Sequence, residues 1–404
     1  MKFGLLGETL RHSFSKQIHS VFGDYEYEYY EKSREEAEKL IKSRALSGMN
    51  VTIPYKELAY SLCDELSDTA REAGCVNTVI YRDGKIHGDN TDVFGFMYML
   101  SRGGVSLSGK SVLILGSGGT SKTARLAARR LGAKSMTVVS RRGEVNYENV
   151  YDICRDAEVI INTTPVGMYP NVGVSAIDLS RFPKCVAVAD VVYNPQRTKL
   201  LQDAEALHIP HVGGLYMLAA QGHRAADTFL DEKLPEALIE EAVKSVSRSL
   251  SNIILIGMPG SGKSTVGKLV AKALSRRFVD TDEEIEKRFG APGAIITEQG
   301  EDAFREIEKQ VVADVAKESG LVIATGGGVV EREENYRSLS QNGTVYLIER
   351  DITALATDGR PLSKDISALW ERRREKYLRF ADVKIENNED VSEAAEKIIK
   401  SFTK

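Results

Sequence analysis

The spacing of hydrophobic positions divides the chain into strands and helices that alternate over most of its length. Short apolar runs such as SVLILG, AEVIINTTP and CVAVADVVY have the length and composition of buried strands. Segments such as TSKTARLAARRLGA and REEAEKLIKSRAL instead repeat their apolar residues at helical spacing. The protein is therefore expected to be α/β, and the alternation within residues 101–225 predicts a parallel, doubly wound sheet.

The pattern changes along the chain and predicts three segments. Residues 1–100 mix short strands and helices, and CVNTVIY followed by RDGK predicts a hairpin with an Asp-Gly turn. One or two helices, interrupted near Pro235, are expected to return to this first segment. A Ser-rich polar stretch follows, and IILIG then begins a new strand–loop–helix unit. The expected divisions are 1–246 (1–100 and about 224–246 as one part, 101–223 as another), a linker over 247–252, and a further domain over 253–404.

Composition narrows the class of protein. A length of 404 residues suggests roughly two to three folding units. The net charge is −4 and the basic residues are dispersed, so we expect no nucleic-acid partner. No apolar run approaches the roughly 20 residues of a membrane helix, and MKFGLLGETL lacks the apolar stretch of a signal peptide. The 4 cysteines form no CxxC pair, which predicts reduced thiols and a cytoplasmic location.

A phosphate-binding motif lies at GMPGSGKST, late in the chain. It fits GxxxxGK[ST] in full, follows a predicted strand and opens a predicted helix. Its glycines let backbone N–H groups turn toward phosphate oxygens, its lysine reaches the β- and γ-phosphates, and its serine ligates Mg²⁺. The alternative is an ordinary Gly-rich turn. The expected ATP-binding residues are Gly257, Gly260, Ser261, Gly262, Lys263, Ser264 and Thr265.

Charged residues after this loop point to phosphoryl transfer. FVDTDEEIE places Asp280 and Asp282 at the end of the next predicted strand, where both carboxylates can face the phosphates. One can hold Mg²⁺ and the other can orient an attacking hydroxyl, although a solvated strand end would show the same spacing. AFREIE sets Arg305 and Glu308 one helical turn apart, and the glycines of VIATGGGVV allow backbone to approach a ligand closely.

Two later motifs, DGRPLS and WERRREKY, complete the set. Together with the phosphate-binding loop and the charged motifs after it, they make residues 252–404 resemble shikimate kinase. The resemblance implies that Asp280 and Ser264 hold magnesium. It implies that Asp282 binds substrate hydroxyls and orients the proton. It also implies that Lys263 and Arg360 act on the transferring phosphate, with Arg360 in a mobile lid.

The same resemblance identifies residues that grip the substrate carboxylate. These are Arg305, Gly327 and Arg373, since a planar guanidinium matches a carboxylate bidentately. Arg373 is placed by counting back from Tyr377, within a run of three arginines.

A second glycine-rich loop lies earlier, in VLILGSGGTSKTA. It is a loose version of the dinucleotide fingerprint, between a predicted strand and a predicted helix. The next strand ends in VVSRRGE, where an acidic residue would hold the ribose of NAD. Two arginines stand there instead and favour the 2′-phosphate of NADP, although they could also form a solvated basic loop. The expected cofactor-binding residues are Gly116, Gly118, Gly119, Thr120, Ser140, Arg141 and Arg142.

The motifs HSFSKQIH, GMNVTIPYKE, GCVNTV and GDNTDVFGF together resemble shikimate dehydrogenase, over residues 1–246. Lys56 and Asp92 match that family's catalytic pair, although the two residue types alone would also fit a surface ion pair. Ser13 and Ser15 would donate hydroxyl hydrogen bonds to the substrate carboxylate. The resemblance further implies substrate contacts by Asn50, Thr52, Asn77, Tyr193 and Gln221, and cofactor contacts by Asn162, Thr163 and Gly214.

The reactions of the two families that the chain resembles share one intermediate, shikimate. They imply an α/β substrate domain, a Rossmann-like NADP domain and a P-loop kinase domain with a parallel sheet. The expected reactions are NADPH-dependent reduction of 3-dehydroshikimate to shikimate, then phosphorylation by ATP and Mg²⁺ to shikimate 3-phosphate. Lys56 and Asp92 would supply or relay the proton that the reduction needs.

Three alternatives stay open at this stage. The first half could prefer quinate and NAD. The second half could phosphorylate another small molecule, such as gluconate. It could also bind ATP without catalysis, because residues 349–363 are short for the lid of that family.

Overall fold

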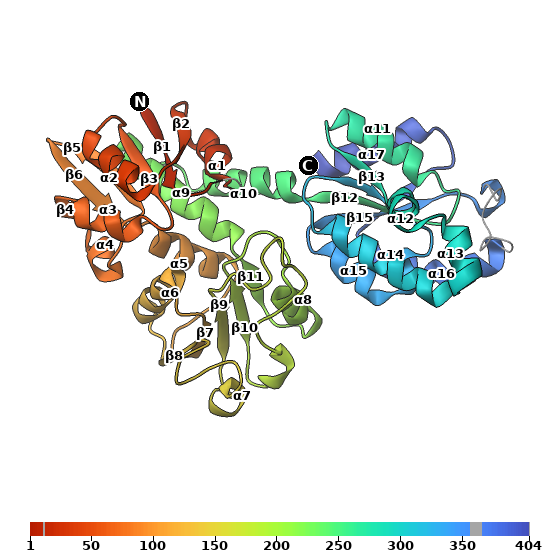
Figure 1. Cartoon of the computed structure of the whole chain (residues 1–404), viewed down its shortest axis with the longest axis horizontal. Helices are drawn as coiled ribbons and strands as arrows, with labels where there is room; N and C mark the ends of the chain where they lie inside the picture. Colours follow the sequence, from red (N-terminus) through yellow and green to blue (C-terminus); the bar gives the residue numbers. More distant parts are fainter. Residues whose placement is uncertain (11–12, 356–365, 404) are drawn as a thin grey trace. The chain divides into compact units, whose positions relative to one another are not determined.

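A computed structural model describes residues 1–10, 13–355 and 366–403, which fall into two compact units (Figure 1). The first unit comprises Met1–Met168 and Val174–Ser247, and the second comprises Tyr169–Gly173 and Arg248–Lys404. In the part of the chain that is described, the first unit holds a six-stranded and a five-stranded sheet, and the second holds a five-stranded sheet.

The first sheet is mixed and has the order β2-β1-β3-β5-β6-β4. Strands β5 and β6 pair antiparallel through a turn at Asp83 and Gly84, whose φ angles are 50° and 71°. Two successive positive φ angles are typical of the tightest hairpin turns, so the predicted Asp-Gly hairpin is confirmed. The strands are β1 (Lys2–Gly7), β2 (Glu26–Glu31), β3 (Gly48–Val51), β4 (Glu65–Leu66), β5 (Thr78–Arg82) and β6 (Lys85–Asp89); the helices are α1 (Ser15–Phe22), α2 (Arg34–Ser43), α3 (Lys56–Leu62), α4 (Asp68–Ala73) and α5 (Asp92–Arg102).

The second sheet is parallel throughout and has the order β11-β10-β9-β7-β8. Its central strands are continuous apolar runs because helices and loops cover both faces. The predicted doubly wound arrangement is therefore confirmed. The strands are β7 (Ser111–Leu115), β8 (Ser135–Val139), β9 (Val159–Asn162), β10 (Ala187–Asp190) and β11 (His211–Gly213); the helices are α6 (Gly119–Arg130), α7 (Val150–Ile153), η1 (Leu179–Arg181) and α8 (Lys199–Ala206).

Two long helices, α9 (Leu215–Leu230) and α10 (Ala237–Leu250), follow this sheet on either side of Pro235. Helix α9 packs against α1 and α5 of the first segment (Figure 1). The Ser-rich stretch expected as a linker over 247–252 is instead helical through Leu250. The reason is that buried apolar residues recur at helical spacing among its serines, at Ala242, Val246 and Leu250.

The third sheet is also parallel, with the order β13-β14-β12-β15-β16. Its central strand β12 is buried along its whole length. The strands are β12 (Asn252–Ile256), β13 (Phe278–Asp280), β14 (Val322–Ala324), β15 (Gly343–Glu349) and β16 (Val383–Glu386); the helices are α11 (Lys263–Ala273), α12 (Thr281–Phe289), α13 (Pro292–Gln299), α14 (Glu301–Ala316), η2 (Val329–Glu331), α15 (Glu333–Ser340), η3 (Ile352–Ala354), α16 (Ile366–Phe380) and α17 (Val391–Thr403).

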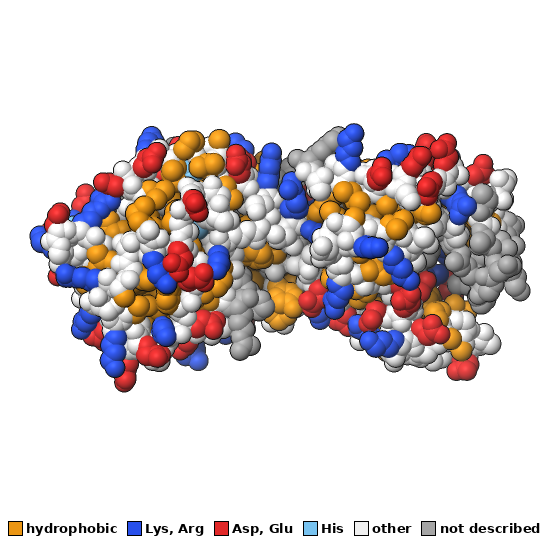
Figure 2. Space-filling view, turned by 90° about the horizontal axis from the view of Figure 1, so that it is seen from above, with side chains coloured by type: hydrophobic (Ala, Val, Ile, Leu, Met, Phe, Trp, Pro, Cys, Tyr) orange, Lys and Arg blue, Asp and Glu red, His pale blue; other side chains and the backbone are white. Residues whose placement is uncertain are grey.

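The surface agrees with the dispersed charge of the sequence. Figure 2 shows basic and acidic side chains interspersed over the face in view, with no basic stripe. Among the described helices, none combines the length and the apolar character needed to cross a membrane.

Candidate active sites

A cavity of about 600 Å³ in the first unit lies between the carboxyl ends of strands and the amino ends of helices. This is where open α/β sheets bind their ligands. Glu8, Met168 and Met217 also line it, although the sequence did not single them out as site residues. The expected residues that line it are Ser13, Ser15, Asn50, Thr52, Lys56, Asn77, Asp92, Thr120, Tyr193, Gly214 and Gln221.

Lys56 and Asp92 form a direct ion pair in this cavity. The Lys56 Nζ donates to Asp92 Oδ2 at 2.6 Å, and Asn77 Nδ2 donates to Asp92 Oδ1 at 2.9 Å. The side chains are 26% and 14% exposed, so the pair is partly enclosed rather than a solvated surface contact. Both residues begin helices, and the negative charge of Asp92 is stabilised at the amino end of α5. The arrangement holds an ammonium group ready to donate a proton or to stabilise negative charge.

Two serine hydroxyls lie side by side at another wall of the cavity. Ser13 Oγ donates to Ser15 Oγ at 3.1 Å, and Tyr29 fixes this loop because its hydroxyl donates to the Ser13 carbonyl at 2.8 Å. The buried Tyr27 hydroxyl donates to Asn50 Oδ1 at 2.8 Å and orients that amide. Both tyrosines were missed from the sequence. The alternation in EYEYYE was the available signal, since it places them on one face of β2.

The earlier glycine-rich loop has the geometry of a phosphate cradle. Gly116 has a φ of 100°, and a Cβ there would lie 2.7 Å from Thr164 Cγ2, so only glycine fits without a shift. A Cβ at Gly118 or Gly119 would meet open space, which leaves the backbone accessible at the amino end of α6. A helix amino terminus with accessible N–H groups suits a pyrophosphate. The residues present therefore fit a dinucleotide.

Asn162 and Thr163 support this loop from the end of β9. Asn162 Nδ2 donates to Asp190 Oδ1 at 2.9 Å, and Thr163 Oγ1 donates to the Leu115 carbonyl at 2.7 Å. Burial raises the pKa of the Asp190 carboxyl from 3.8 to about 6. These contacts tie three neighbouring strands together at their carboxyl ends.

Arg141 and Arg142 are exposed directly after β8, beside Ser140. Within residues 1–10, 13–355 and 366–403, neither arginine forms an ion pair. Two uncommitted guanidinium groups at the end of this strand suit a ribose 2′-phosphate.

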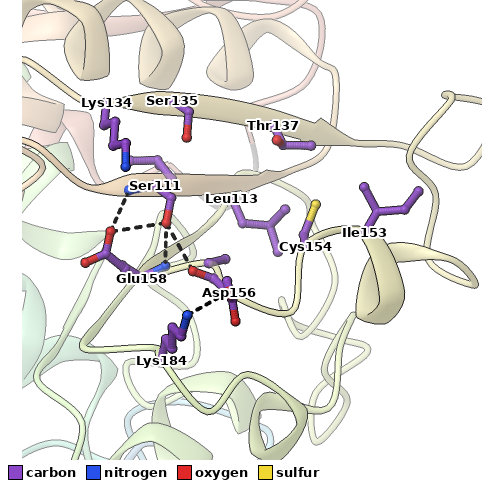
Figure 3. Close-up of a pocket in the computed structure, with 12 residues that line it drawn as sticks. Ser111, Leu113, Lys134, Ser135, Thr137, Ile153, Cys154, Asp156, Glu158 and Lys184 are labelled. Carbon is purple, nitrogen blue, oxygen red and sulfur yellow. Dashed lines mark hydrogen bonds and ion pairs between the residues drawn. The ribbon is translucent and has the colours of Figure 1, made fainter.

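A further hollow of about 480 Å³ lies at the opposite, amino ends of β7, β8 and β9. Figure 3 shows bonds among some of its polar side chains: Lys184 pairs with Asp156 at 2.7 Å, and Ser111 Oγ donates to Glu158 at 3.2 Å. Because Asp156, Glu158 and Lys184 are already paired and the hollow lies at the amino ends of the strands, it is no candidate for the nucleotide site.

The second unit holds a cavity of about 490 Å³ beside the later glycine-rich loop. The β12–α11 loop, the start of α12, helix α14, the loop after β14 and helix α16 contribute to it. Arg360 lies outside the described residues. The expected residues that line this cavity are Gly260, Lys263, Ser264, Asp280, Asp282, Arg305, Gly327 and Arg373.

One end of this cavity offers oxygen ligands. Ser264 Oγ donates to Asp280 Oδ2 at 2.6 Å, and Lys263 Nζ donates to the Gly257 and Met258 carbonyls at 2.9 Å. Among the described residues, no group of three or more His, Cys, Asp and Glu side chains gathers as a metal site. A hydroxyl and a carboxylate nevertheless fit Mg²⁺, which binds few protein ligands and takes the rest from phosphate and water.

Asp282 reaches the cavity differently from the expectation. It lies in the first turn of α12, whereas β13 ends at Asp280. The Asp280 side chain caps this helix by accepting from the Asp282 N–H at 3.0 Å. The turn after the strand, rather than strand alternation, therefore brings both carboxylates to the cavity.

The other end of the cavity carries two buried guanidinium groups. Arg305 is 4% exposed and Arg373 is 2% exposed. Arg305 Nη1 donates to Glu308 Oε2 at 2.8 Å, and Arg373 Nη1 donates to the Gly327 carbonyl at 3.0 Å. In the part of the chain that the structure describes, Arg305 Nε and Arg373 Nη2 have no hydrogen-bond partner. Buried donors without partners are costly, so two guanidinium groups at this end suit an anion such as a carboxylate.

The three glycines after β14 each make room for a different part of the site. A Cβ on Gly326 would lie 2.5 Å from Asp282 Oδ1, and one on Gly327 would lie 2.7 Å from the Pro259 ring. A Cβ on Gly328 would overlap the guanidinium of Arg305. The predicted close approach of backbone is thus explained by the site's own side chains.

Two protein families match parts of the chain. A family model described as the shikimate dehydrogenase substrate binding domain matches residues 5–79, and one described as shikimate kinase matches residues 259–403. A shikimate dehydrogenase (NADP(+)) from Clostridium perfringens is 35% identical over 263 residues, which cover 59% of this chain and 97% of that protein.

Solved structures show the same likeness. Shikimate dehydrogenase 1 from Peptoclostridium difficile is 33% identical with a TM-score of 0.56, over 61% of this chain and 98% of that one. Shikimate 5-dehydrogenase from Thermus thermophilus, solved with NADP(H) and shikimate, is 31% identical with a TM-score of 0.54. That match covers 60% of this chain and 98% of that one.

Proposed function

The chain belongs to the shikimate dehydrogenase family and carries a shikimate kinase domain over residues 259–403, and we propose that it performs both reactions in sequence. The first reaction is the reduction of 3-dehydroshikimate to shikimate. The second reaction is the phosphorylation of shikimate to shikimate 3-phosphate. The observation that carries this proposal is that two matches in separate parts of the chain name the same molecule. Residues 1–246 would perform the first reaction and residues 253–404 the second. The free state of all four cysteines supports a reducing, cytoplasmic setting.

At the first site, Ser13 and Ser15 hold the substrate carboxylate, and Asn50, Thr52, Asn77, Tyr193 and Gln221 contact the substrate. Bound NADPH supplies a hydride to the ring ketone. Lys56 then donates a proton to the developing alkoxide, or stabilises its charge while Asp92 relays the proton. The 2.6 Å ion pair keeps the ammonium aimed for this step.

At the second site, Arg305 and Arg373 hold the shikimate carboxylate, with Gly327 between them. Asp282 accepts a hydrogen bond from the reacting hydroxyl and orients it. Lys263 stabilises charge on the transferring phosphate, and Ser264 and Asp280 would hold Mg²⁺. By resemblance, Arg360 acts on the same phosphate.

Separate assays of the full chain test each half. Oxidation of NADPH should require 3-dehydroshikimate, and release of ADP should require shikimate and Mg²⁺. Quinate with NAD and gluconate with ATP serve as competing substrates. Faster turnover of quinate with NAD, or of gluconate, would overturn the assignment of that half. ATP binding without any ADP release would show a binding module instead.

A further inference from the structure

Glu331, at the end of η2, binds three cationic side chains of α16. Its Oε1 accepts from Arg373 Nε at 2.7 Å and from Arg372 Nη2 at 2.9 Å, and its Oε2 accepts from Lys376 Nζ at 2.5 Å. The Glu331 side chain is only 14% exposed. Burial alone would raise the pKa of this carboxyl, but the bonds from Lys376 and Arg373 outweigh it and lower the pKa to about 2. Glu331 is therefore a fixed negative charge behind the cavity.

This carboxylate decides which part of Arg373 faces the cavity. A guanidinium has donors on three nitrogens. Nε is used by Glu331 and Nη1 by the Gly327 carbonyl, while Nη2 has no partner among the described residues. Arg373 lines the cavity, whereas Glu331 does not. The two contacts thus fix the plane of the guanidinium and leave Nη2 without a hydrogen-bond partner in the described structure.

Glu331 also separates Arg373 from its charged neighbours. Arg372 and Lys376 are 55% and 39% exposed, and both turn to the same carboxylate. Without it, three adjacent cations would repel one another at one end of the cavity.

We propose that Glu331 is a positioning residue for substrate recognition, which fixes the plane in which the Arg373 guanidinium meets the substrate carboxylate. The inference rests on the proposed kinase function. It assigns Glu331 no contact with substrate or nucleotide. The alternative is that Glu331 has only a structural fastening role, in which its ion pairs hold η2 against α16.

The test compares Glu331→Gln with Glu333→Gln in the full chain. Glu333 pairs with Arg379 of the same helix, and both side chains are at least half exposed, so its change is a matched control. Each variant is assayed for phosphorylation of shikimate and of the analogue in which a carboxamide replaces the carboxylate. The analogue cannot form the charged contact with Arg373. The KM for ATP is measured in parallel.

For Glu331→Gln we expect the KM for shikimate to rise about tenfold, the size of one weakened charged hydrogen bond, with kcat and the ATP KM within about twofold. Turnover of the carboxamide should change less than about twofold, as should every constant of Glu333→Gln. Equal losses on shikimate and carboxamide, or a fall in kcat alone, would show a fastening role and overturn the inference. If the unmodified chain phosphorylates neither compound, the kinase proposal fails first and takes the inference with it.

Discussion

At the scale of single residues, the reactive groups of both sites are held by neighbouring side chains rather than by solvent. Lys56 is fixed by Asp92, which is fixed in turn by Asn77. Arg305 and Arg373 are buried, and each keeps a donor without a hydrogen-bond partner in the described structure. Such preorganisation lets a group act without first giving up contacts with water.

Replacing Lys56 tests the proton donor. We expect Lys56→Met to lower kcat/KM for 3-dehydroshikimate by about 10²- to 10⁴-fold, the usual contribution of a general acid, with kinase turnover unchanged. Lys122→Met is the control, because Lys122 forms an exposed ion pair with Glu57. Steady-state rates of both reactions measure the effect. A loss below threefold would remove Lys56 from the mechanism.

The raised pKa of Asp190, about 6 against an ordinary 3.8, predicts a pH dependence of stability. The folded state binds the proton more tightly than the unfolded state. The stabilising contribution is therefore present at low pH and is lost as pH rises from about 4 through 6, by on the order of 2–3 kcal/mol. Asp190→Asn removes this titration.

Calorimetric unfolding of both proteins near pH 4.5 and pH 7 provides the measurement. The stability of the unmodified chain relative to Asp190→Asn should be greater at the lower pH. A difference that is constant across pH, or that reverses, would mean that Asp190 is ionised throughout.

At residue scale, sequence reasoning identified the groups that lie in recognisable motifs. It could not separate Arg373 from Arg372 and Arg374 except by counting, because all three are arginines in one run. Burial separates them, since Arg373 is 2% exposed and lines the cavity. Glu331 had no sequence signal, because its role depends on a contact across 42 positions.

At the scale of elements, the sites occupy loops at the carboxyl ends of parallel strands, as topology requires. The two parallel sheets were predictable because buried parallel strands are continuous apolar runs. The helical end of α10 was not predictable, because its serines resemble those of a linker. Its helical spacing is seen only in the positions that are buried in the structure. Asp282 was placed on a strand for a similar reason, as a strand of 3 residues leaves little alternation to read.

The loop after β8 should set cofactor preference. We expect Arg141→Ser with Arg142→Ser to raise the KM for NADPH about tenfold or more and to leave that for NADH within about twofold, because charged contacts to the 2′-phosphate are lost. Arg129→Ser, an exposed change on α6, is the control. Equal effects on both nucleotides would place the 2′-phosphate elsewhere.

At the scale of the whole molecule, the chain forms two compact units, and each has its own glycine-rich loop and cavity. Each site's described lining residues come from its own unit. We therefore expect the two reactions to be chemically separable.

Lys263→Met tests that separation. The lysine lies in the phosphate-binding loop, so we expect phosphorylation to fall by about 10³-fold or more, as expected when a phosphate-binding cation is removed. Reduction of 3-dehydroshikimate should keep its rate within about twofold. Parallel assays of NADPH oxidation and ADP release measure the two activities of this variant. A matching loss of both activities would contradict independent sites.

The central claim is that one chain makes shikimate and then phosphorylates it. The most direct measurement is the product mass from pure protein with 3-dehydroshikimate, NADPH, ATP and Mg²⁺, with ATP omitted as the control. We expect a gain of two hydrogens without ATP, and the further gain of one phosphoryl group when ATP is present. Reduction that is never followed by phosphorylation would contradict the second half, and no reduction under either condition would contradict the first.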